Sequence, residues 1–375
     1  MGMDNDNTTT KAKAKSPKKR ILWNVFYIFL TICIMVVICL LDPNARNIPH
    51  LLTTLKPMWI GAALFGMLLF WLLEGETVHY MTKFIHRGFG HLKSFKTAMI
   101  GVYYSALTPF SSGGQPMQVM HMKRDGVPVG RSTSMFCVKF IVFEFVVCTF
   151  FIVGLAVDGL SFFSGRTQVF YLTCLGFALN AFLASLALAA IFSKHKLQVL
   201  AARLVVWLHK IHIGRFYLIK NPQRALDSLN NTLNEFASSA GLLRENKRVL
   251  IGSFLLMAGQ MLIQYSITYC IYRAFDLSGV SYWNIIFMQA FLFLTVSFVP
   301  LPGAAGASEG GFYLFFALIF PGTIMPLAML LWRFATYYAN ILFGSFFVMY
   351  DGMRGALGVS SAKSRGVPVQ PDKEA

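Results

Sequence analysis

The chain has 375 residues, of which 56% are hydrophobic and only 13% are charged. Soluble globular domains carry about 25% charged residues, so this composition excludes an ordinary soluble domain and indicates a polytopic membrane protein. The 33 Lys and Arg residues against 16 Asp and Glu residues give a net charge of +17, which in a membrane protein favours contact with an anionic lipid leaflet over contact with nucleic acid.

The chain begins with a polar segment, residues 1–20, that ends in a basic cluster. Residues 21–41 follow as an almost uninterrupted apolar stretch. This stretch is too long for the core of a signal peptide, and no small-residue cleavage site follows it. We therefore expect a basic cytoplasmic N-terminus and a first transmembrane helix.

Further along the chain there are five continuous apolar segments and two interrupted ones. The continuous segments are residues 58–73 (with a continuation to 81 as an alternative), 135–157, 168–192, 249–272 and 326–349. The interrupted segments, residues 98–119 and 283–320, contain Pro and Gly where a membrane helix should be continuous. In hydrocarbon an unpaired backbone N–H or C=O costs several kcal/mol, so broken helices persist only inside protein or beside a cavity. A pair of them in corresponding positions of two halves points to the binding site of a transporter.

The first break, TPFSSGGQPMQ at residues 108–118, concentrates small polar groups. Hydroxyls, an amide and unhindered backbone N–H groups come together there, and a helix restarting near the second Pro adds its positive dipole end. Such a turn suits a phosphate or a carboxylate, whereas the alternative is an ordinary Pro/Gly turn between two helices. The candidate binding residues are Ser111, Ser112, Gly113, Gly114 and Gln115.

The second break, VPLPGAAGASEGG at residues 299–311, surrounds one acidic residue, Glu309, with Pro and Gly. An ionisable side chain at membrane depth predicts a functional site with a charged partner. Arg333 in the next apolar segment is the expected partner, and Tyr337 shares its helical face. The alternative is a purely structural ion pair between hairpin and helix. The candidate residues of this half are Gly303, Gly306, Glu309, Arg333 and Tyr337.

Four other ionisable residues lie in or beside the apolar segments. Lys139 and Glu144 share the segment 135–157, but a spacing of five residues is poor for a pair on one helix. Glu144 lies deeper and is the better candidate for substrate contact, whereas Lys139 is close enough to the helix end for its amine to reach the interface. Glu74 and Glu76 end the preceding segment, and we expect both at the interface.

The distribution of basic residues predicts which segments cross the membrane, by the positive-inside rule. Of the 33 Lys and Arg residues, 27 fall in segments that we assign to the cytoplasm: residues 1–20, 83–97, 120–134, 193–248 and 350–375. Each broken segment must then return to the side from which it came. We expect an all-α polytopic membrane protein with about six transmembrane helices, two oppositely oriented re-entrant hairpins, an inverted-repeat arrangement and both termini inside. The alternative, in which each broken segment crosses once, places several basic loops outside.

The transmembrane domain is expected at residues 21–350, followed by a disordered cytoplasmic tail at 351–375. The longest hydrophilic segment, residues 193–248, contains four apolar residues at helical spacing, which form one stripe on a helix. Because the segment is also basic, we expect an interfacial helix on the anionic leaflet, with docking of a regulatory partner as the alternative. The stripe consists of Leu226, Leu229, Leu233 and Phe236.

Enzyme signatures are absent from the sequence. There is no phosphate-binding loop for ATP, no nucleophile elbow, and no pair of His or Cys residues at metal-ligand spacing. The six Cys residues fall in apolar segments, and we expect them to be reduced, without a disulfide framework. We therefore expect no cofactor and no metal.

The two breaks resemble motifs of a known family. Residues 108–128, TPFSSGGQPMQVMHMKRDGVP, resemble the Pro-Gly-Gly segment and following basic loop of the lysylphosphatidylglycerol synthase transmembrane family, also called flippase-like integral membrane proteins. Residues 300–312, PLPGAAGASEGGF, resemble the Pro- and Gly-rich motif with Glu-Gly in that family. Arg333 with Tyr337 is similar to its Arg-x-x-x-Tyr helix. The resemblance covers residues 20–355, essentially all of the apolar sequence.

The resemblance implies a function in lipid metabolism. In full-length members, a cytoplasmic domain moves lysine from lysyl-tRNA to phosphatidylglycerol, and the membrane part translocates the product outward, which blunts cationic antimicrobial peptides. Because the chain continues only to Ala375 after its last apolar segment, we expect the translocating part without the transferase domain. The expected function is translocation of a phospholipid such as lysyl-phosphatidylglycerol in a bacterial inner membrane. The alternatives are phosphatidylglycerol lysyltransferase activity and a membrane scaffold for a partner synthase.

In this interpretation the headgroup phosphate contacts the turn at residues 111–115, and Glu309 faces a lipid amine or balances Arg333. The expected partners are the phospholipid of the bilayer and the anionic inner leaflet. A separate lipid synthase and a second copy of the chain are further candidates, and no nucleic acid is expected.

Overall fold

The computed structural model describes residues 29, 33, 37, 46–159, 162–192, 212–213, 216–217 and 222–364. The predicted N-terminal segment, residues 1–20, lies outside these residues. The predicted first crossing, residues 21–41, also lies outside them apart from three positions, and so does the end of the predicted tail, residues 365–375.

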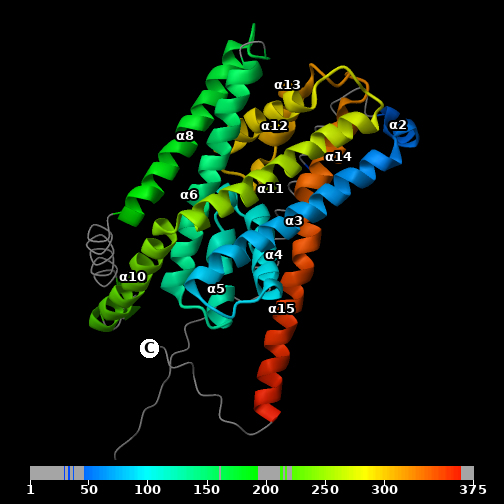
Figure 1. Cartoon of the computed structure of the whole chain (residues 1–375). Coiled ribbons are helices and arrows are strands. Elements are labelled where there is room, and N and C mark those ends of the chain that lie inside the picture. The colour runs from blue at the N-terminus through cyan, green and yellow to red at the C-terminus, as the bar shows by residue number, and fades with distance from the viewer. Residues whose placement is uncertain are drawn as a thin grey trace, which may run out of the picture.

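The protein is an all-α membrane protein, and the described chain consists almost entirely of helices (Figure 1). Two strands of two residues each, β1 (His212–Ile213) and β2 (Phe216–Tyr217), pair antiparallel. The long helices are α3 (Pro57–Ile85), α4 (His91–Leu107), α6 (Val129–Gly154), α8 (Thr167–Phe192), α10 (Pro222–Glu245), α11 (Lys247–Ala274), α12 (Tyr282–Val296) and α15 (Ala339–Ser364). The short elements are α2 (Ile48–Thr54), α5 (Gly114–Arg124), α13 (Ala307–Phe316), α14 (Met325–Arg333), the 3₁₀ turns η2 (Pro109–Ser111) and η4 (Pro302–Ala304), and the π-helical turns η3 (Leu155–Gly159) and η5 (Phe334–Tyr338).

Four helices of the described chain are long and apolar enough to cross a membrane, and each matches a predicted crossing. They are α3, α6 with its extension to Val157, α8 and α11. Asn246 caps the start of α11 by accepting a hydrogen bond from the N–H of Val249. The predicted crossing at residues 326–349 forms α14, η5 and α15 in direct succession, with the π-helical turn in the middle. Helix α15 continues to Ser364, into the segment that we predicted as the tail.

Each broken segment forms two helices that pack against each other on either side of the break. In the first, α4 and α5 approach so closely at Gly101 that a Cβ atom there would lie 2.1 Å from Nε2 of Gln118. In the second, a Cβ atom at Gly311 of α13 would lie 2.5 Å from the side chain of Leu292 in α12. Because the two arms lie side by side, the chain turns back at the break, as a re-entrant hairpin requires.

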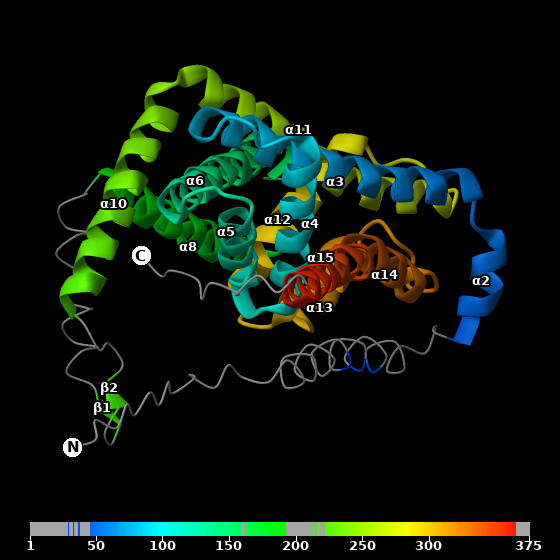
Figure 2. The ribbon, with the colours of Figure 1, turned by 90° about the horizontal axis from the view of Figure 1, so that it is seen from below.

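Helix α10 and helix α2 lie on opposite sides of the molecule (Figure 2). Helix α10 packs against α6, where a Cβ atom at Gly130 would lie 2.4 Å from the carbonyl oxygen of Thr232. Phe236 of the predicted apolar stripe is buried, so this part of the stripe packs within the protein. The side chain of Leu226 lies outside the described part of the chain. Contact of α10 with the lipid leaflet therefore stays a prediction.

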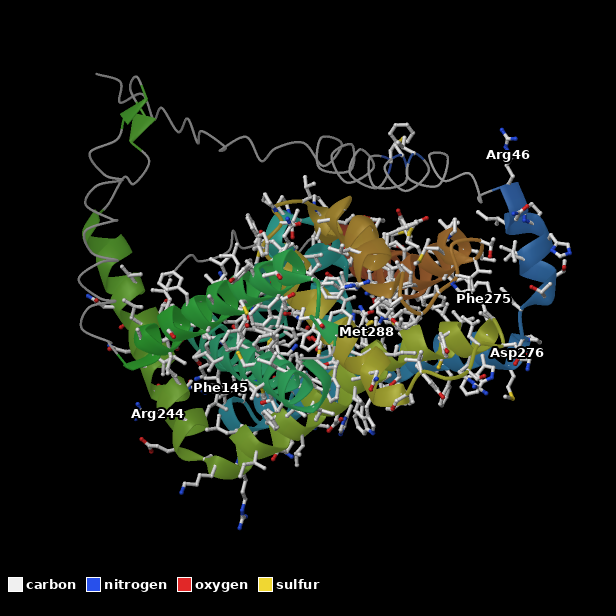
Figure 3. The ribbon with its side chains drawn as sticks, turned by 90° about the horizontal axis from the view of Figure 1, so that it is seen from above. Arg46, Phe145, Arg244, Phe275, Asp276 and Met288 are labelled. Atoms are coloured by element: carbon white, nitrogen blue, oxygen red, sulfur yellow. The ribbon has the colours of Figure 1, made fainter. Side chains whose placement is uncertain are left out.

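The middle of the molecule combines a packed core with an apolar surface. In Figure 3, Arg46 and Asp276 lie at one end and Arg244 at the other, with Phe145 and Met288 between them. Phe145 on α6 is 57% exposed, whereas Met288 on α12 is 4% exposed. Water would penalise such an exposed aromatic ring, but hydrocarbon would not. This region of the surface therefore suits the bilayer.

The hairpin topology predicts on which side of the membrane two exposed residues lie. Lys123 belongs to the basic segment after the first break, and Ser278 follows α11. In a background without the native Cys residues, we expect Lys123→Cys to react with an impermeant thiol reagent only from the cytoplasm and Ser278→Cys only from outside. Intact cells and inside-out vesicles provide the two measurements. Labelling of Lys123→Cys in intact cells would overturn the first hairpin.

Candidate functional site

The two breaks share one backbone conformation although their sequences differ. In each, an extended residue precedes a Pro, and the two residues after the Pro have positive φ. The second of these donates its N–H to the carbonyl of the residue before the Pro, with N···O distances of 3.1 Å at Ser111 and 2.8 Å at Ala304. The matched residues are Thr108 (φ −117°) and Leu301 (φ −119°), Pro109 and Pro302, Phe110 (φ 53°) and Gly303 (φ 59°), and Ser111 (φ 53°) and Ala304 (φ 48°). The breaks thus repeat each other in backbone geometry, as an internal repeat requires.

Three residues in these turns, Phe110, Ser111 and Ala304, adopt the left-handed region without being glycine. Left-handed backbone costs an L-residue with a Cβ atom roughly 1–2 kcal/mol. Strain of this kind persists where the surrounding structure holds it, often at binding sites. The two turns, η2 and η4, also contact each other, so the strained positions of both halves meet in one place.

The backbone N–H groups of the first break are largely used within the turn itself. Ser111 donates its N–H to the carbonyl of Thr108 at 3.1 Å, and Ser112 donates to the carbonyl of the intervening Pro at 3.1 Å. The N–H of Gly113 donates to Oγ1 of Thr108 at 2.8 Å. These three groups are therefore not the anion-binding concavity that we predicted, because the turn satisfies them. The Ser112 hydroxyl donates to the same Pro carbonyl at 2.8 Å, so the turn uses it as well. The Ser111 hydroxyl and the Gln115 amide are the candidate donors of residues that line the cavity described below.

The second break contains the predicted ion pair between Glu309 and Arg333. Nε of Arg333 lies 2.7 Å from Oε1 of Glu309, and the two side chains are 5% and 0% exposed. The other carboxylate oxygen, Oε2, accepts a hydrogen bond from the N–H of Gly306 at 2.6 Å. Nη2 of Arg333 donates to the carbonyl of Gly303 at 2.7 Å. The pair therefore fixes the turn at two points.

Tyr337 connects the second break to the first. Its ring centroid lies 4.3 Å from the guanidinium carbon of Arg333, and its hydroxyl donates to the carbonyl of Ala106 at 3.1 Å, near the end of α4. A Cβ atom at Gly303 would lie 2.2 Å from the Tyr337 ring, so the ring covers the turn without a gap. The contact between Arg333 and Tyr337 agrees with their predicted position on one helical face.

A cavity of about 1000 Å³ lies between the two breaks and helices α3, α6, α8, α11 and α12. The predicted site residues that line it are Ser111, Ser112, Gln115, Glu144, Gly303, Arg333 and Tyr337. The other predicted residues, Gly113, Gly114, Gly306 and Glu309, are not among its lining residues. Glu309 is thus placed to balance Arg333, and the structure favours this role over contact with a lipid amine.

Sequence reasoning missed a polar cluster on the cavity wall. Lys139 of α6 donates a hydrogen bond to Glu74 of α3, and both side chains are largely buried. Nε2 of Gln260 in α11 donates to the second Glu74 oxygen at 3.1 Å. The expectation that Glu74 lies at the interface is wrong, because its side chain is largely buried against Lys139 of another helix. The sequence signal for this cluster was an acidic residue, Glu74, at the end of one apolar segment and a basic residue, Lys139, within another.

Glu144 of α6 is the remaining acidic residue of the wall. Its side chain is 3% exposed, and its Oε2 atom has no hydrogen-bond partner among the residues that the structure describes. The two basic residues of the wall, Lys139 and Arg333, each pair with another carboxylate. Glu144 therefore differs from the other acids of the cavity in lacking a cationic partner within the described chain.

The cavity extends to an apolar, exposed rim. On α8, the lining residues Leu179, Phe182 and Leu183 are exposed, with Phe182 reaching 64%. At the two breaks, Phe110 and Leu301 also line the cavity and are exposed. Large apolar side chains at a rim are suited to hydrocarbon rather than to water. The described rim therefore suits an opening toward the acyl chains of the bilayer.

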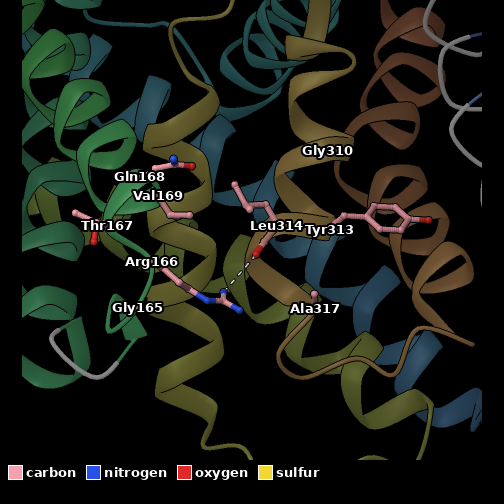
Figure 4. Close-up of a pocket in the computed structure, with 9 residues that line it drawn as sticks. All are labelled: Gly165, Arg166, Thr167, Gln168, Val169, Gly310, Tyr313, Leu314 and Ala317. Atoms are coloured by element: carbon pink, nitrogen blue, oxygen red, sulfur yellow. Dashed lines mark hydrogen bonds between the residues drawn. The ribbon is translucent and has the colours of Figure 1, made fainter.

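A second pocket, of about 930 Å³, lies where the start of α8 faces α13 (Figure 4). Arg166 is the charged side chain among its lining residues, and it donates to the carbonyl of Leu314 at 3.4 Å. No carboxylate belongs to the lining of this pocket. The central cavity, with four charged side chains and both breaks, is therefore the better candidate site.

Comparison with known proteins places this chain within a described family. Residues 24–344 match the family described as the lysylphosphatidylglycerol synthase TM region. A relative from Archaeoglobus fulgidus, described as a UPF0104 membrane protein, is 23% identical over 295 residues, which cover 75% of this chain and 83% of the relative. The residues matched to the family include both breaks and the Glu309–Arg333 pair.

Proposed function

Because this chain belongs to the family of lysylphosphatidylglycerol synthase TM regions, we propose that this multi-pass, lipid-related membrane protein is a lipid translocase. The proposed substrate is a phospholipid such as lysyl-phosphatidylglycerol, moved between the leaflets of a bacterial inner membrane. Outward movement of a cationic lipid lowers the negative surface charge that attracts cationic peptides, so the proposal includes resistance to cationic antimicrobial peptides. Both termini are proposed to face the cytoplasm.

One observation carries the proposal: a cavity with charged residues in its wall has an exposed apolar rim. Lys139 and Arg333 lie in the wall, and Phe110 and Phe182 are exposed at the rim. A phospholipid is divided in the same way, because its headgroup is charged and its acyl chains are apolar. A water-soluble solute gains nothing from an apolar rim, so the cavity favours a lipid.

In this proposal the headgroup phosphate binds beside Arg333, near the turn at residues 111–115, where the Ser111 hydroxyl and the Gln115 amide are the proposed donors. A guanidinium group has five N–H donors in a fixed fork. In Arg333, Nε faces Glu309, and one donor of Nη2 binds the carbonyl of Gly303. The remaining donors can contact a phosphate while the pair with Glu309 stays intact.

The test is translocation by purified protein in vesicles that contain lysyl-phosphatidylglycerol. An impermeant amine-reactive reagent reports the amine in the outer leaflet. We expect Gln115→Leu to slow the movement roughly two- to tenfold, because a hydrogen bond worth about 0.5–1.5 kcal/mol is lost. The matched control, Gln168→Leu in the second pocket, should move lipid at the rate of the unmodified protein. If no phospholipid moves faster than in protein-free vesicles, the proposal is wrong.

The family description, which names a synthase, favours a second function, phosphatidylglycerol lysyltransferase. This function predicts that labelled lysine passes from lysyl-tRNA into the lipid fraction of synthase-free cells that express the chain. We expect no such labelling. A third function, as a scaffold for a partner synthase, is excluded if the purified protein moves lipid without any partner.

A further inference from the structure

The charges around the central cavity do not balance within the described chain. Four charged side chains line it, and two of them, Lys139 and Glu74, form an ion pair with each other. Arg333 pairs with Glu309, which does not line the cavity. Glu144 is left as the carboxyl group without a countercharge among these residues.

The surroundings of Glu144 make an unpaired negative charge unfavourable. The side chain is 3% exposed and lies in a crossing helix, with Oε2 lacking a hydrogen-bond partner among the described residues. Burial of an isolated carboxylate is strongly unfavourable, and buried charges are normally paired or neutralised. Two states of Glu144 avoid this cost. The carboxyl group either carries a proton or pairs with a cation that enters the cavity.

The cavity wall near Glu144 suits a cation of the ammonium type. Phe140 precedes Glu144 by one helical turn and also lines the cavity, and aromatic faces attract ammonium groups. Tyr265 of α11 is buried in the same wall, and its hydroxyl has no hydrogen-bond partner in the described chain. Arg333 supplies the opposite charge in the same cavity. A headgroup with both a phosphate and an amine therefore finds a partner for each.

We propose that Glu144 exchanges a proton for the ammonium group of a lipid headgroup, which couples lipid movement to proton movement in the opposite direction. This inference rests on the proposed function as a lipid translocase. It narrows the substrate class to phospholipids that carry a primary amine, and it identifies the proton gradient as the energy source.

The exchange conserves both charge and atoms. In the empty cavity the Glu144 carboxyl holds a proton on one oxygen. When the ammonium group arrives, that O–H bond breaks, the proton passes to cavity water, and the carboxylate pairs with the ammonium. When the lipid leaves, a proton from water returns to the carboxylate. At Glu144 one positive charge replaces another, and in lysyl-phosphatidylglycerol the second lysine amine balances the phosphate. The cavity therefore never contains the unpaired carboxylate that burial disfavours.

Few other ionisable groups face Glu144 from the elements packed against α6. Helices α5, α8 and α12 contribute only uncharged side chains to the cavity lining, and α10 meets α6 near Gly130 without lining the cavity. No residue of η3 lines the cavity. The ionisable groups of the wall and of the next turn of α6 are Glu74 of α3, Tyr265 of α11, Arg333 of α14, Tyr337 of η5, and Lys139 and Cys148 of α6 itself. Because Glu74 and Arg333 are paired, Glu144 is the acid on this wall that can change charge without breaking an ion pair.

The experiment imposes a pH gradient on vesicles that contain the purified full chain and lysyl-phosphatidylglycerol. An impermeant amine-reactive reagent measures the fraction of lipid in the outer leaflet, and an internal dye measures proton uptake. With the outside more acidic by about one pH unit, we expect the outer-to-inner ratio of the lipid to rise toward about tenfold, because the two gradients are linked one to one. In vesicles that contain phosphatidylglycerol instead, which lacks an amine, the dye should report no protein-dependent proton uptake.

Two variants separate the role of Glu144 from a general effect of removing a carboxyl group. Glu144→Gln should abolish the gradient-driven accumulation and the proton uptake, and Glu144→Asp, which keeps a carboxyl group, should retain both in part. The matched control is Glu76→Gln, because Glu76 is a partly exposed acid of α3 that contacts His91 and does not line the cavity. This variant should accumulate lipid as the unmodified protein does.

The outcomes distinguish this inference from the proposed function. If the unmodified protein moves lipid but distributes it equally whatever the gradient, the proton coupling is wrong and lipid translocation stands. If it moves no lipid at all, the proposed function itself is wrong. Accumulation that persists in Glu144→Gln would assign the coupling to another residue and overturn the role of Glu144. The gradient measurement on the unmodified protein decides the coupling even if Glu144→Gln does not fold.

Discussion

Replacement of either Glu309 or Arg333 alone is expected to deplete folded protein, whereas replacement of both restores folding without lipid movement. Glu309→Gln leaves the buried Arg333 without its countercharge, and Arg333→Met leaves Glu309 unpaired at 0% exposure. Breaking one side of a buried pair typically costs ~3–5 kcal/mol, and replacing both sides can be nearly neutral. The yield of monodisperse protein and its thermal unfolding midpoint measure the effect.

The double variant Glu309→Gln with Arg333→Met decides what the pair does. We expect it to fold but to move no lipid in vesicles, because the charge proposed to bind the phosphate is gone. Recovery of lipid movement in this variant would mean that the pair only stabilises the packing of α13 against α14. The matched control is the pair formed by Lys56 and Asp276, whose side chains are 51% and 69% exposed. Replacing both of these should change neither the yield nor the activity.

A graded series of Gly→Ala substitutions in the second break is expected to produce the next largest effect. Gly303 has φ 59°, and a Cβ atom there would lie 2.2 Å from the Tyr337 ring. The ring cannot move aside easily, because Arg333 lies against it and its hydroxyl is bonded to Ala106. We expect Gly303→Ala to cost roughly 1–2 kcal/mol in backbone strain and a further ~1–3 kcal/mol in overpacking.

The same break supplies matched controls for this substitution. Gly306 also has positive φ, at 84°, but a Cβ atom there meets nothing within 4 Å, so Gly306→Ala should cost the backbone strain alone. Gly310 lies in α13 with ordinary φ and open space, and Gly310→Ala should be neutral or stabilising by up to about 1 kcal/mol. Thermal unfolding in detergent measures all three. Equal stability of Gly303→Ala and Gly310→Ala would contradict the close contact with Tyr337.

Properties of single segments were predictable from the sequence. Lengths of apolar sequence identified the crossings at α3, α6, α8 and α11, because the bilayer requires a certain length of apolar helix. Pro and Gly within apolar runs identified both breaks, because an interrupted helix must satisfy its backbone inside the protein. The pair of Glu309 with Arg333 was also predictable, because the break at membrane depth contains one acid and the next apolar segment contains one base.

Relations between segments were decided only by the tertiary structure. The pairing of Lys139 with Glu74, the use of the Gly113 N–H by Thr108, and the burial of part of the α10 stripe all depend on which neighbour each helix meets. A sequence records the chemistry of each position along the chain, but it does not record the distances across helices that determine which charges compensate each other. For this reason Glu144 was recognised as a candidate from the sequence, whereas its lack of a countercharge among the described residues became visible only when Lys139 and Arg333 were found paired elsewhere.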